Sequence, residues 1–346
     1  MSSAHMLPTG DQFAPELAHS DHGHDLVVLG DCNPDVIVLG GDVTPAFGQQ
    51  EKLVGSMRLV IGGSASITAV AAARLGLRVA LVAAVGDDPA GQLMTSMLAA
   101  EGVDVSAVAV RCDQATGMTL VLSRGSDRAI LTATAAMASL TADDVPDELV
   151  RSAAHMHVSS YFLLEDSLGP GLPGVFAAAR AAGATTSLDT NWDPAGRWGG
   201  PQLRAVLAQT DLLLPNEAEA LALSGADSLD DAIGRLTGVG ARLVVKLGAR
   251  GARTAAPSPA RDSAAGGSVQ YDVSVPAVEP ADTTGAGDCF NAGLITGLLR
   301  GLDLPHAAAL GCAVGAASTQ ALGGTGSVPA LPDVLPAARA AVIRRA

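Results

Sequence analysis

The chain is short of lysine, of aromatic side chains and of long apolar runs, and each shortage excludes a class of protein. Lysine occurs only at Lys52 and Lys246, and 35 acidic residues outweigh 21 basic ones, which gives a formal net charge of −14. We expect no nucleic-acid partner, because such partners are bound by clustered Lys and Arg side chains. No run of 18 apolar residues occurs, so we expect no membrane-spanning helix.

Cysteine is also scarce, and its spacing argues against a metal site. The four cysteines are Cys32, Cys112, Cys289 and Cys312. None forms a C-x-x-C pair, and no spacing is typical of zinc ligands. The simplest interpretation is reduced thiols in a cytoplasmic protein. The first residues lack the order of a signal peptide, which agrees with that location.

Residues 1–24 are polar and show no periodicity, so we expect a flexible N-terminal tail. His19, His22 and His24 cluster near its end. They could chelate a metal, but incidental histidines in a mobile tail are the favoured interpretation.

From Asp25 onward, apolar strand-like runs alternate with helical patterns rich in small residues. Repeated strand–helix units with short links predict a parallel sheet with helices on both faces. The fold class is therefore α/β, and residues 25–346 are predicted to form a single domain. A composition that is 48% apolar but only 3% aromatic suits such closely packed layers.

Two segments, about 36–60 and 107–134, interrupt this alternation. The second contains TGMTLVLS and DRAILTAT, which predict short antiparallel strands. We expect the two segments to pair into a small β lid over the site. An exposed edge of that lid could pair between two subunits, which would make a homodimer.

The strongest chemical signal is the string ADTTGAGDCFNAGLITGLL, residues 281–299. Gly285, Ala286 and Gly287 stand where a loop becomes a helix, so their N–H groups can converge on an anion with help from the helix dipole. Asp288 follows on the first turn. A carboxylate beside an anion nest makes sense as a base that takes a proton from an attacking hydroxyl. The alternative is an Asp that merely caps the helix.

This string resembles the C-terminal signature of the ribokinase family, also called the PfkB carbohydrate kinases. The resemblance implies a ribokinase-like three-layer fold, ATP and Mg²⁺ as cofactors, Asp288 as the catalytic base and Gly285 to Gly287 as the anion hole. It also implies a monovalent cation site, expected to hold K⁺. Its proposed residues are Asp282, Thr284, Gly323 and Ser327.

The acceptor site is indicated by two N-terminal segments. GGSASITAVAAARLG resembles the family's Gly-Gly segment, with Gly62 and Gly63 at the lid hinge. Ile67 stands where the family usually has Asn, which puts one polar substrate contact in doubt. GDCNPD resembles the family's G-x-x-N-x-D segment, which implies that Asp35 binds acceptor hydroxyls with Asn33 nearby.

An Asp that simply turns the chain between two strands is the alternative at Asp35. Asp42 is a weaker candidate of the same kind.

The nucleotide region is indicated by LLLPNEAEALAL and VVKLGARGA. The first resembles the family's N-x-x-E motif, which implicates Asn216 and Glu219 in holding Mg²⁺ through water. The second resembles the family's nucleotide-binding strand and turn, in which Gly248 and Gly251 would let the backbone approach the nucleotide, and Lys246 could approach its phosphates. Alone, the first is also a good helix start. Asp189 and Asn191 end a strand where ligands of α/β sheets bind, so we expect them near the site.

Together these features predict transfer of the γ-phosphate of ATP to a hydroxyl, expected to be primary, of a sugar-like molecule. No G-x-x-x-x-G-K-[ST] occurs, and no G-x-G-x-x-G follows the first strand, so P-loop and dinucleotide enzymes are not favoured. Two alternatives remain open: a nucleoside kinase of the same family, and a non-catalytic regulator that binds a sugar or nucleotide. The sequence does not name the acceptor.

Overall fold

The structure is a computed structural model that describes Phe13 and residues 23–124, 127–238, 240–257 and 268–346. Its strands are β1 His24–Leu29, β2 Asn33–Leu39, β3 Ser56–Gly62, β4 Val79–Gly86, β5 Val108–Arg111, β6 Met118–Arg124, β7 Asp127–Ala133, β8 Ala153–Val158, β9 Thr185–Leu188, β10 Leu212–Leu213, β11 Arg242–Lys246, β12 Ala252–Pro257, β13 Ser268–Ser274 and β14 Val342–Arg345. Its α-helices are α1 Ser64–Arg74, α2 Pro89–Ala100, α3 Asp147–Ser152, α4 Tyr161–Leu164, α5 Leu172–Ala181, α6 Pro201–Leu207, α7 Glu217–Ser224, α8 Leu229–Thr237, α9 Ala286–Leu299, α10 Leu304–Ser318 and α11 Leu331–Arg339.

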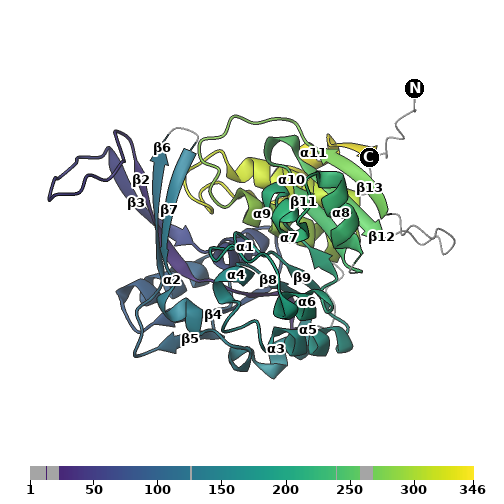
Figure 1. Cartoon of the computed structure of the whole chain (residues 1–346), viewed down its shortest axis with the longest axis horizontal. Helices are drawn as coiled ribbons and strands as arrows, with labels where there is room; N and C mark the ends of the chain where they lie inside the picture. Colours follow the sequence, from purple (N-terminus) through teal and green to yellow (C-terminus); the bar gives the residue numbers. More distant parts are fainter. Residues whose placement is uncertain (1–12, 14–22, 125–126, 239, 258–267) are drawn as a thin grey trace.

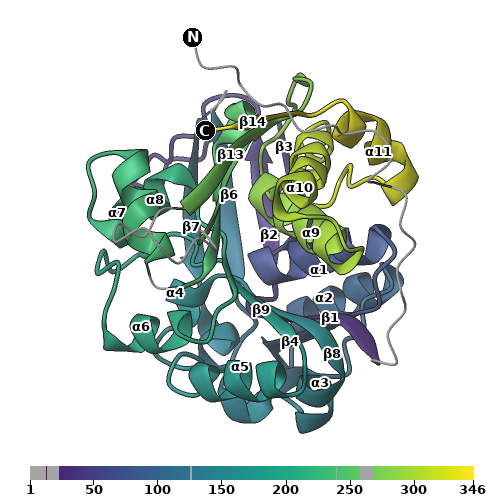
Figure 2. The same ribbon diagram turned by 90° about the vertical axis from the view of Figure 1, so that its right-hand side faces the viewer.

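A large sheet forms the centre, with the strand order β14-β13-β12-β11-β10-β9-β8-β1-β4-β5. The pairs from β11 to β5 are parallel, and the pairs from β11 to β14 are antiparallel. Helices α1, α2, α9, α10 and α11 lie on one side of this sheet, and α5, α6, α7 and α8 lie on the other (Figure 2). The predicted α/β fold with a mostly parallel central sheet and helices on both faces is confirmed.

Strand β1 shows why the central strands read as continuous apolar runs. Successive side chains of a strand point to opposite faces. Leu26 and Val28 pack into the core on the α9 side, whereas Val27 and Leu29 pack into the core on the α5 side. Both faces are covered, so the four positions from Leu26 to Leu29 are all apolar.

The strands β3, β2, β6 and β7 pair in that order into a separate small sheet, which we call the lid sheet. It stands beside the main body, and the chain between β2 and β3 projects from it (Figure 1). β6 and β7 are antiparallel, as the alternation predicted.

The predicted lid segment 107–134 is wrong in its first part. β5 pairs in parallel with β4 at the edge of the large sheet, so the segment joins the lid sheet only from Met118. A four-residue strand carries no local sign of which sheet it will join.

Most of the predicted tail lies outside the described residues, including His19 and His22. Two of its described residues are ordered. Phe13 is buried, with its ring centroid 6.1 Å from that of His306. His24 already belongs to β1, and its Nε2 lies 3.1 Å from Asp104 Oδ2. Across the described part of the chain, no helix is long and apolar enough to cross a membrane.

Candidate active site

A cavity of about 390 Å³ opens between the lid sheet and the carboxyl ends of the parallel strands. This is where open α/β sheets bind ligands. The structure brings most of the predicted residues to its wall: Asn33, Asp35, Gly63, Asn216, Glu219, Lys246, Gly248, Thr284, Gly285, Ala286, Gly287 and Asp288, with Asp189, Asn191 and Ile67.

The turn before α9 has the conformation that an anion nest needs. Gly285 adopts φ 72°, a left-handed conformation that favours glycine. A Cβ at this position would also lie 2.6 Å from Gly324 Cα and 3.1 Å from Ile67 Cγ2, so the turn leaves no room for a side chain. The N–H groups of Gly285 and Gly287 make no backbone hydrogen bond to the described residues. They are therefore available to an anion in the cavity.

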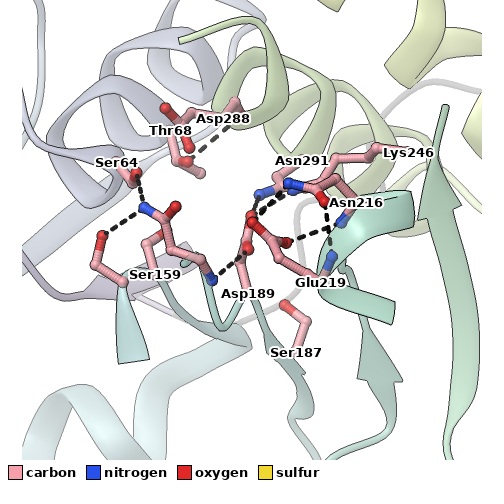
Figure 3. Close-up of polar contacts among 12 residues, drawn as sticks. Ser64, Thr68, Ser159, Ser187, Asp189, Asn216, Glu219, Lys246, Asp288 and Asn291 are labelled. Atoms are coloured by element: carbon pink, nitrogen blue, oxygen red, sulfur yellow. Dashed lines mark hydrogen bonds and ion pairs between the residues drawn. The ribbon is translucent and has the colours of Figure 1, made fainter. Parts of the chain in front are cut away.

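Asp288 lies on the first turn of α9 and faces the same cavity. Enclosure in the cavity and the negative charge of Asp189 raise the pKa of Asp288 well above its usual value, although Lys246 opposes the shift. A carboxylate with a raised pKa accepts a proton more readily. Helix α1 fixes the turn from the other side, since Thr68 Oγ1 donates to the backbone carbonyl of Asp288 at 3.4 Å (Figure 3).

Lys246, at the end of β11, forms a buried ion pair with Asp189. Its Nζ donates to Asp189 Oδ2 at 2.6 Å, and Asn291 Nδ2 donates to the same oxygen at 2.6 Å (Figure 3). Burial alone would raise the pKa of Asp189, but the Lys246 charge and these hydrogen bonds hold it below its usual value. Burial opposes the Lys246 charge, yet Asp189 and Glu219 raise its pKa. The lysine is therefore charged.

The predicted N-x-x-E motif forms a capping box at the start of α7. Asn216 N donates to Glu219 Oε2 at 2.8 Å, and Asn216 Nδ2 donates to Glu219 Oε1 at 2.6 Å. Burial and the charge of Asp189 raise the pKa of Glu219 to about 7. A cation placed nearby would favour the ionised carboxylate.

The opposite wall is built from the lid sheet. Asp35 is buried on β2, and Asn33 Nδ2 donates to Asp35 Oδ1 at 3.1 Å and to Thr119 Oγ1 at 3.0 Å. Burial and the charge of Asp31 raise the pKa of Asp35 to about 7. Gly62 does not line the cavity, but its missing side chain makes room for Asp35, since a Cβ there would lie 1.9 Å from Asp35 Oδ1.

Asp31, the residue after Gly30, was not predicted as part of the site. Its carboxylate accepts hydrogen bonds from Ser64 N at 3.0 Å, Ala65 N at 2.9 Å and Ser160 Oγ at 2.9 Å. It therefore caps α1 from a loop 33 residues earlier. Nothing in the local sequence distinguishes it from a turn aspartate.

Arg128, on β7, was also missed. It lines the cavity, and its Nη1 donates to Thr284 Oγ1 at 3.1 Å, so the lid sheet reaches the turn before α9. Side chains of a strand alternate between its two faces, so Arg128 lies on the same face of β7 as Ile130 and Thr132, which also line the cavity. This alternation could have indicated Arg128 from the sequence.

Three of the four predicted cation-site residues meet. Asp282 Oδ1 accepts from Thr284 N at 2.9 Å and from Thr284 Oγ1 at 2.7 Å, and Asp282 Oδ2 accepts from Gly323 N at 2.9 Å. Ser327 lies outside this group, because its hydroxyl donates to the carbonyls of Ala317 and Ser318 at 2.7 and 3.0 Å.

Two predicted residues lie away from the cavity wall. Gly251 adopts φ 92° in the turn between β11 and β12, and a Cβ there would lie 2.0 Å from Val273 O. It lets the hairpin pack closely against β13, and its contact with the nucleotide stays a prediction. Asp42 is exposed in the segment between β2 and β3, where it pairs with Lys52, so the structure adds no support for the weaker prediction that it binds the acceptor.

The oxygen ligands that line the cavity suit a hydrated Mg²⁺ ion better than a metal bound directly by several side chains. Among the residues that the structure describes, no group of three His, Cys, Asp or Glu side chains is placed to hold a metal. Glu219 lines the cavity, and both oxygens of its carboxylate already accept hydrogen bonds from Asn216. Such a carboxylate suits contact with the ion through a water molecule. Mg²⁺ normally keeps several waters and takes few protein ligands.

Comparisons with known proteins agree with this geometry. The chain is 29% identical over 321 residues to a ribokinase of Haemophilus influenzae, covering 90% of this chain and 97% of that protein. It is 33% identical over 282 residues to a fructokinase of Klebsiella pneumoniae, covering 77% of this chain and 85% of that protein.

A solved structure is similar over nearly the whole chain. It is that of an E. coli ribokinase II candidate in complex with ATP and Mg²⁺, with a TM-score of 0.76, 25% identity, and coverage of 90% of this chain and 97% of that one. The sequence also matches the pfkB family carbohydrate kinase domain over residues 24–331. The chain therefore belongs to the pfkB family of carbohydrate kinases.

Proposed function

We propose that the protein transfers the terminal phosphoryl group of ATP to a hydroxyl, expected to be primary, of a sugar-like molecule. One observation carries the proposal. Asp288 and the turn formed by residues 285–287 line the same cavity as Asp35, with the anion-binding groups and the acceptor-binding carboxylate on facing walls.

In this proposal, Asp35 orients the acceptor by accepting hydrogen bonds from its hydroxyls. Asp288 takes the proton of the attacking hydroxyl as its oxygen bonds to the terminal phosphorus and the bond to the β-phosphate oxygen breaks. The N–H groups of Gly285 and Gly287 stabilise charge on the transferred group. Lys246 adds a fixed positive charge against this turn, since a Cβ on Gly287 would lie 3.6 Å from its Nζ.

Bound ATP with Mg²⁺ would supply the phosphoryl group and neutralise its charge. Asn216 and Glu219 would hold the hydrated ion, and Gly248, with φ 60° at the cavity wall, would let the backbone approach the nucleotide. Arg128 would close the lid sheet over the bound pair by its contact with Thr284 and keep water from the reacting phosphorus.

ADP release in the presence of ATP and Mg²⁺ tests the proposal. We expect at least one of ribose, fructose, 2-keto-3-deoxygluconate and adenosine to raise the rate far above the acceptor-free background. If every acceptor leaves the rate at background while ligands still raise the melting temperature, the protein is a sugar- or nucleotide-binding regulator instead.

A nucleoside is the second candidate acceptor, and one observation favours it. Ile67, Val121 and Ile130 give the cavity an apolar wall, with Ile67 where related kinases usually carry Asn. An apolar wall suits the face of a nucleobase better than a hydroxyl-rich sugar. A higher kcat/KM for adenosine than for any free sugar would select this alternative.

We also propose that the protein is a homodimer that joins two lid sheets. The face of the lid sheet turned away from the cavity exposes Met57, Leu59 and Leu131, at 64%, 50% and 61%. Exposed apolar patches of this kind mark interaction surfaces, and a second copy presents the same patch in a self-complementary way. Light scattering should give twice the chain mass, and Leu59→Glu should give the monomer mass. A wild-type monomer at all concentrations would contradict this.

A further inference from the structure

A second cavity, of about 240 Å³, lies on the face of the large sheet opposite α9. Helices α6, α7 and α8 and the segment after β9 enclose it, and it shares no lining residue with the active-site cavity. Thr190 belongs to its wall, whereas Asp189 and Asn191 line the first cavity. The two cavities therefore meet at three consecutive residues.

The second cavity is apolar with one unsatisfied polar group. Its wall includes Trp198, Leu207 and Leu213. Thr190 is fully buried, and its Oγ1 has no hydrogen-bond partner among the described residues. Buried hydroxyls almost always have a partner, because an unsatisfied one costs free energy. The wall of the cavity therefore includes a residue whose buried hydroxyl is unsatisfied, so a small shift of Thr190 toward a polar atom of a ligand would be favoured.

The cavity also carries one available positive charge. Arg204, exposed on α6, makes no ion pair and no side-chain hydrogen bond to the rest of the described chain. Arg235, on the same wall, is already engaged, since its Nη1 donates to the carbonyls of Ser224 and Gly225 at 3.0 and 2.8 Å. An anionic group bound here would therefore pair with Arg204.

We propose that this cavity binds a small molecule with an apolar body and one anionic group, and that this ligand changes the affinity of the active site for ATP. The volume lies below the roughly 300–1,000 Å³ of pockets for drug-sized ligands, so the ligand is small. The binding part of this proposal is independent of the proposed function, and the coupling part rests on it.

The segment from Asn191 to Trp198 links the two cavities as a stiff unit. Both residues hold left-handed conformations, φ 56° and 50°, although neither is glycine. The buried carboxylate of Asp193 holds the Trp198 end in place by accepting from the N–H groups of Ala195, Arg197 and Trp198 at 2.6–2.8 Å.

The far end of this segment reaches the active site. Asn191 N donates to Asp189 Oδ1 at 3.1 Å, and Asn191 Nδ2 donates to Ser64 Oγ at 3.1 Å. A ligand that packs against Trp198 and Thr190 therefore acts on the segment that positions Asp189. Coupling requires that the ligand bind one arrangement of this segment better than another.

Tryptophan fluorescence of the full-length protein tests binding, since Trp192 and Trp198 are the only tryptophans and their rings lie 4.8 Å apart. Phenylacetate is the probe, and uncharged phenylacetamide is its matched control. We expect saturable binding of phenylacetate, roughly tenfold weaker binding of the amide, and a similar loss in Arg204→Gln. Arg151→Gln, which removes an exposed charge elsewhere, should bind normally.

A blocking variant completes the test. A Cβ on Gly199, which lines the cavity, would meet no atom within 4 Å, so the backbone accepts a side chain there, and the larger side chain of Gly199→Leu should block binding. Equal binding of acid and amide, unchanged binding in Gly199→Leu, or no saturable signal by fluorescence and calorimetry would overturn the site. An unchanged dissociation constant for ATP at saturating phenylacetate would overturn the coupling alone, whether or not any acceptor is turned over.

Discussion

Asp35 occupies the space that a side chain on Gly62 would need: a Cβ at position 62 would lie 1.9 Å from Asp35 Oδ1. The two residues are diagonal neighbours in the antiparallel pair of β2 and β3, where Asn33 is opposite Gly62 and Asp35 is opposite Val60. The glycine predicted at the lid hinge and the carboxylate proposed to bind the acceptor are therefore one structural unit.

Gly62→Ala should consequently raise the KM for the acceptor by roughly 10–100-fold, because Asp35 must move and its charged hydrogen bonds to the acceptor are lost. The KM for ATP should stay unchanged. Gly174→Ala in α5 is the matched control, since a Cβ there meets no atom within 4 Å and both constants should be normal. Steady-state kinetics measure both KM values. An unchanged acceptor KM in Gly62→Ala would contradict the proposal that Asp35 binds the acceptor.

The two lysines of the chain should behave very differently when replaced. Lys246→Met leaves the buried Asp189 carboxylate without its cation, so the free energy of unfolding should fall by about 3–5 kcal/mol. Lys52→Met removes an exposed pair with Asp42 and should cause little measurable change. Urea unfolding measures both, and equal effects of the two substitutions would contradict the buried ion pair.

Stability should depend on pH through Asp35, whose pKa in the folded protein is about 7 against an ordinary 3.8. Between about pH 4 and pH 7 the folded state binds more protons at this group than the unfolded state, so its contribution to stability falls as the pH rises. The free energy of unfolding of Asp35→Asn, relative to that of the wild type, should therefore rise by roughly 2–4 kcal/mol from pH 4 to pH 8.

The control for this pH dependence is Asp113→Asn, at an exposed aspartate outside the cavity. The difference in free energy of unfolding between this variant and the wild type should stay constant over the same pH range. A difference for Asp35→Asn that stays flat across the same range would show that burial does not shift this carboxyl group.

A monovalent cation should activate the enzyme. Asp282 gathers Thr284 and Gly323 beside the turn that carries Gly285, so a cation bound there would steady the anion-binding N–H groups. We expect a higher kcat in K⁺ than in Na⁺ at equal ionic strength, with tetramethylammonium as the control. Equal rates in all three salts would count against this site.

The sequence predicts the layers of the fold because buried parallel strands and small-residue helices carry strong periodic signals. β1 and α9 are examples, since apolar and small residues fill most of their buried positions. The assignment of β5 failed for the opposite reason: Val108–Arg111 is too short to reveal its neighbour, and strand pairing is a long-range property.

The site was predicted where its chemistry is local and missed where it is not. The turn before Asp288 is contiguous, so its residue types alone indicate an anion nest. Asn291 follows Asp288 by three residues on one helix face, and this spacing could have indicated its place beside Asp189. Asp31 and Thr190 could not be found, because their roles depend on partners, or on a missing partner, far along the chain.

Asp288→Asn is the most direct test of the account. The amide keeps the shape of the side chain but cannot take the proton of the acceptor hydroxyl, so kcat should fall by roughly 10²–10⁴-fold while the calorimetric dissociation constant for ATP stays unchanged. Asp333→Asn, at the same first-turn position of α11, should turn over normally. Near-normal kcat in Asp288→Asn would contradict the central claim that this carboxylate is the base.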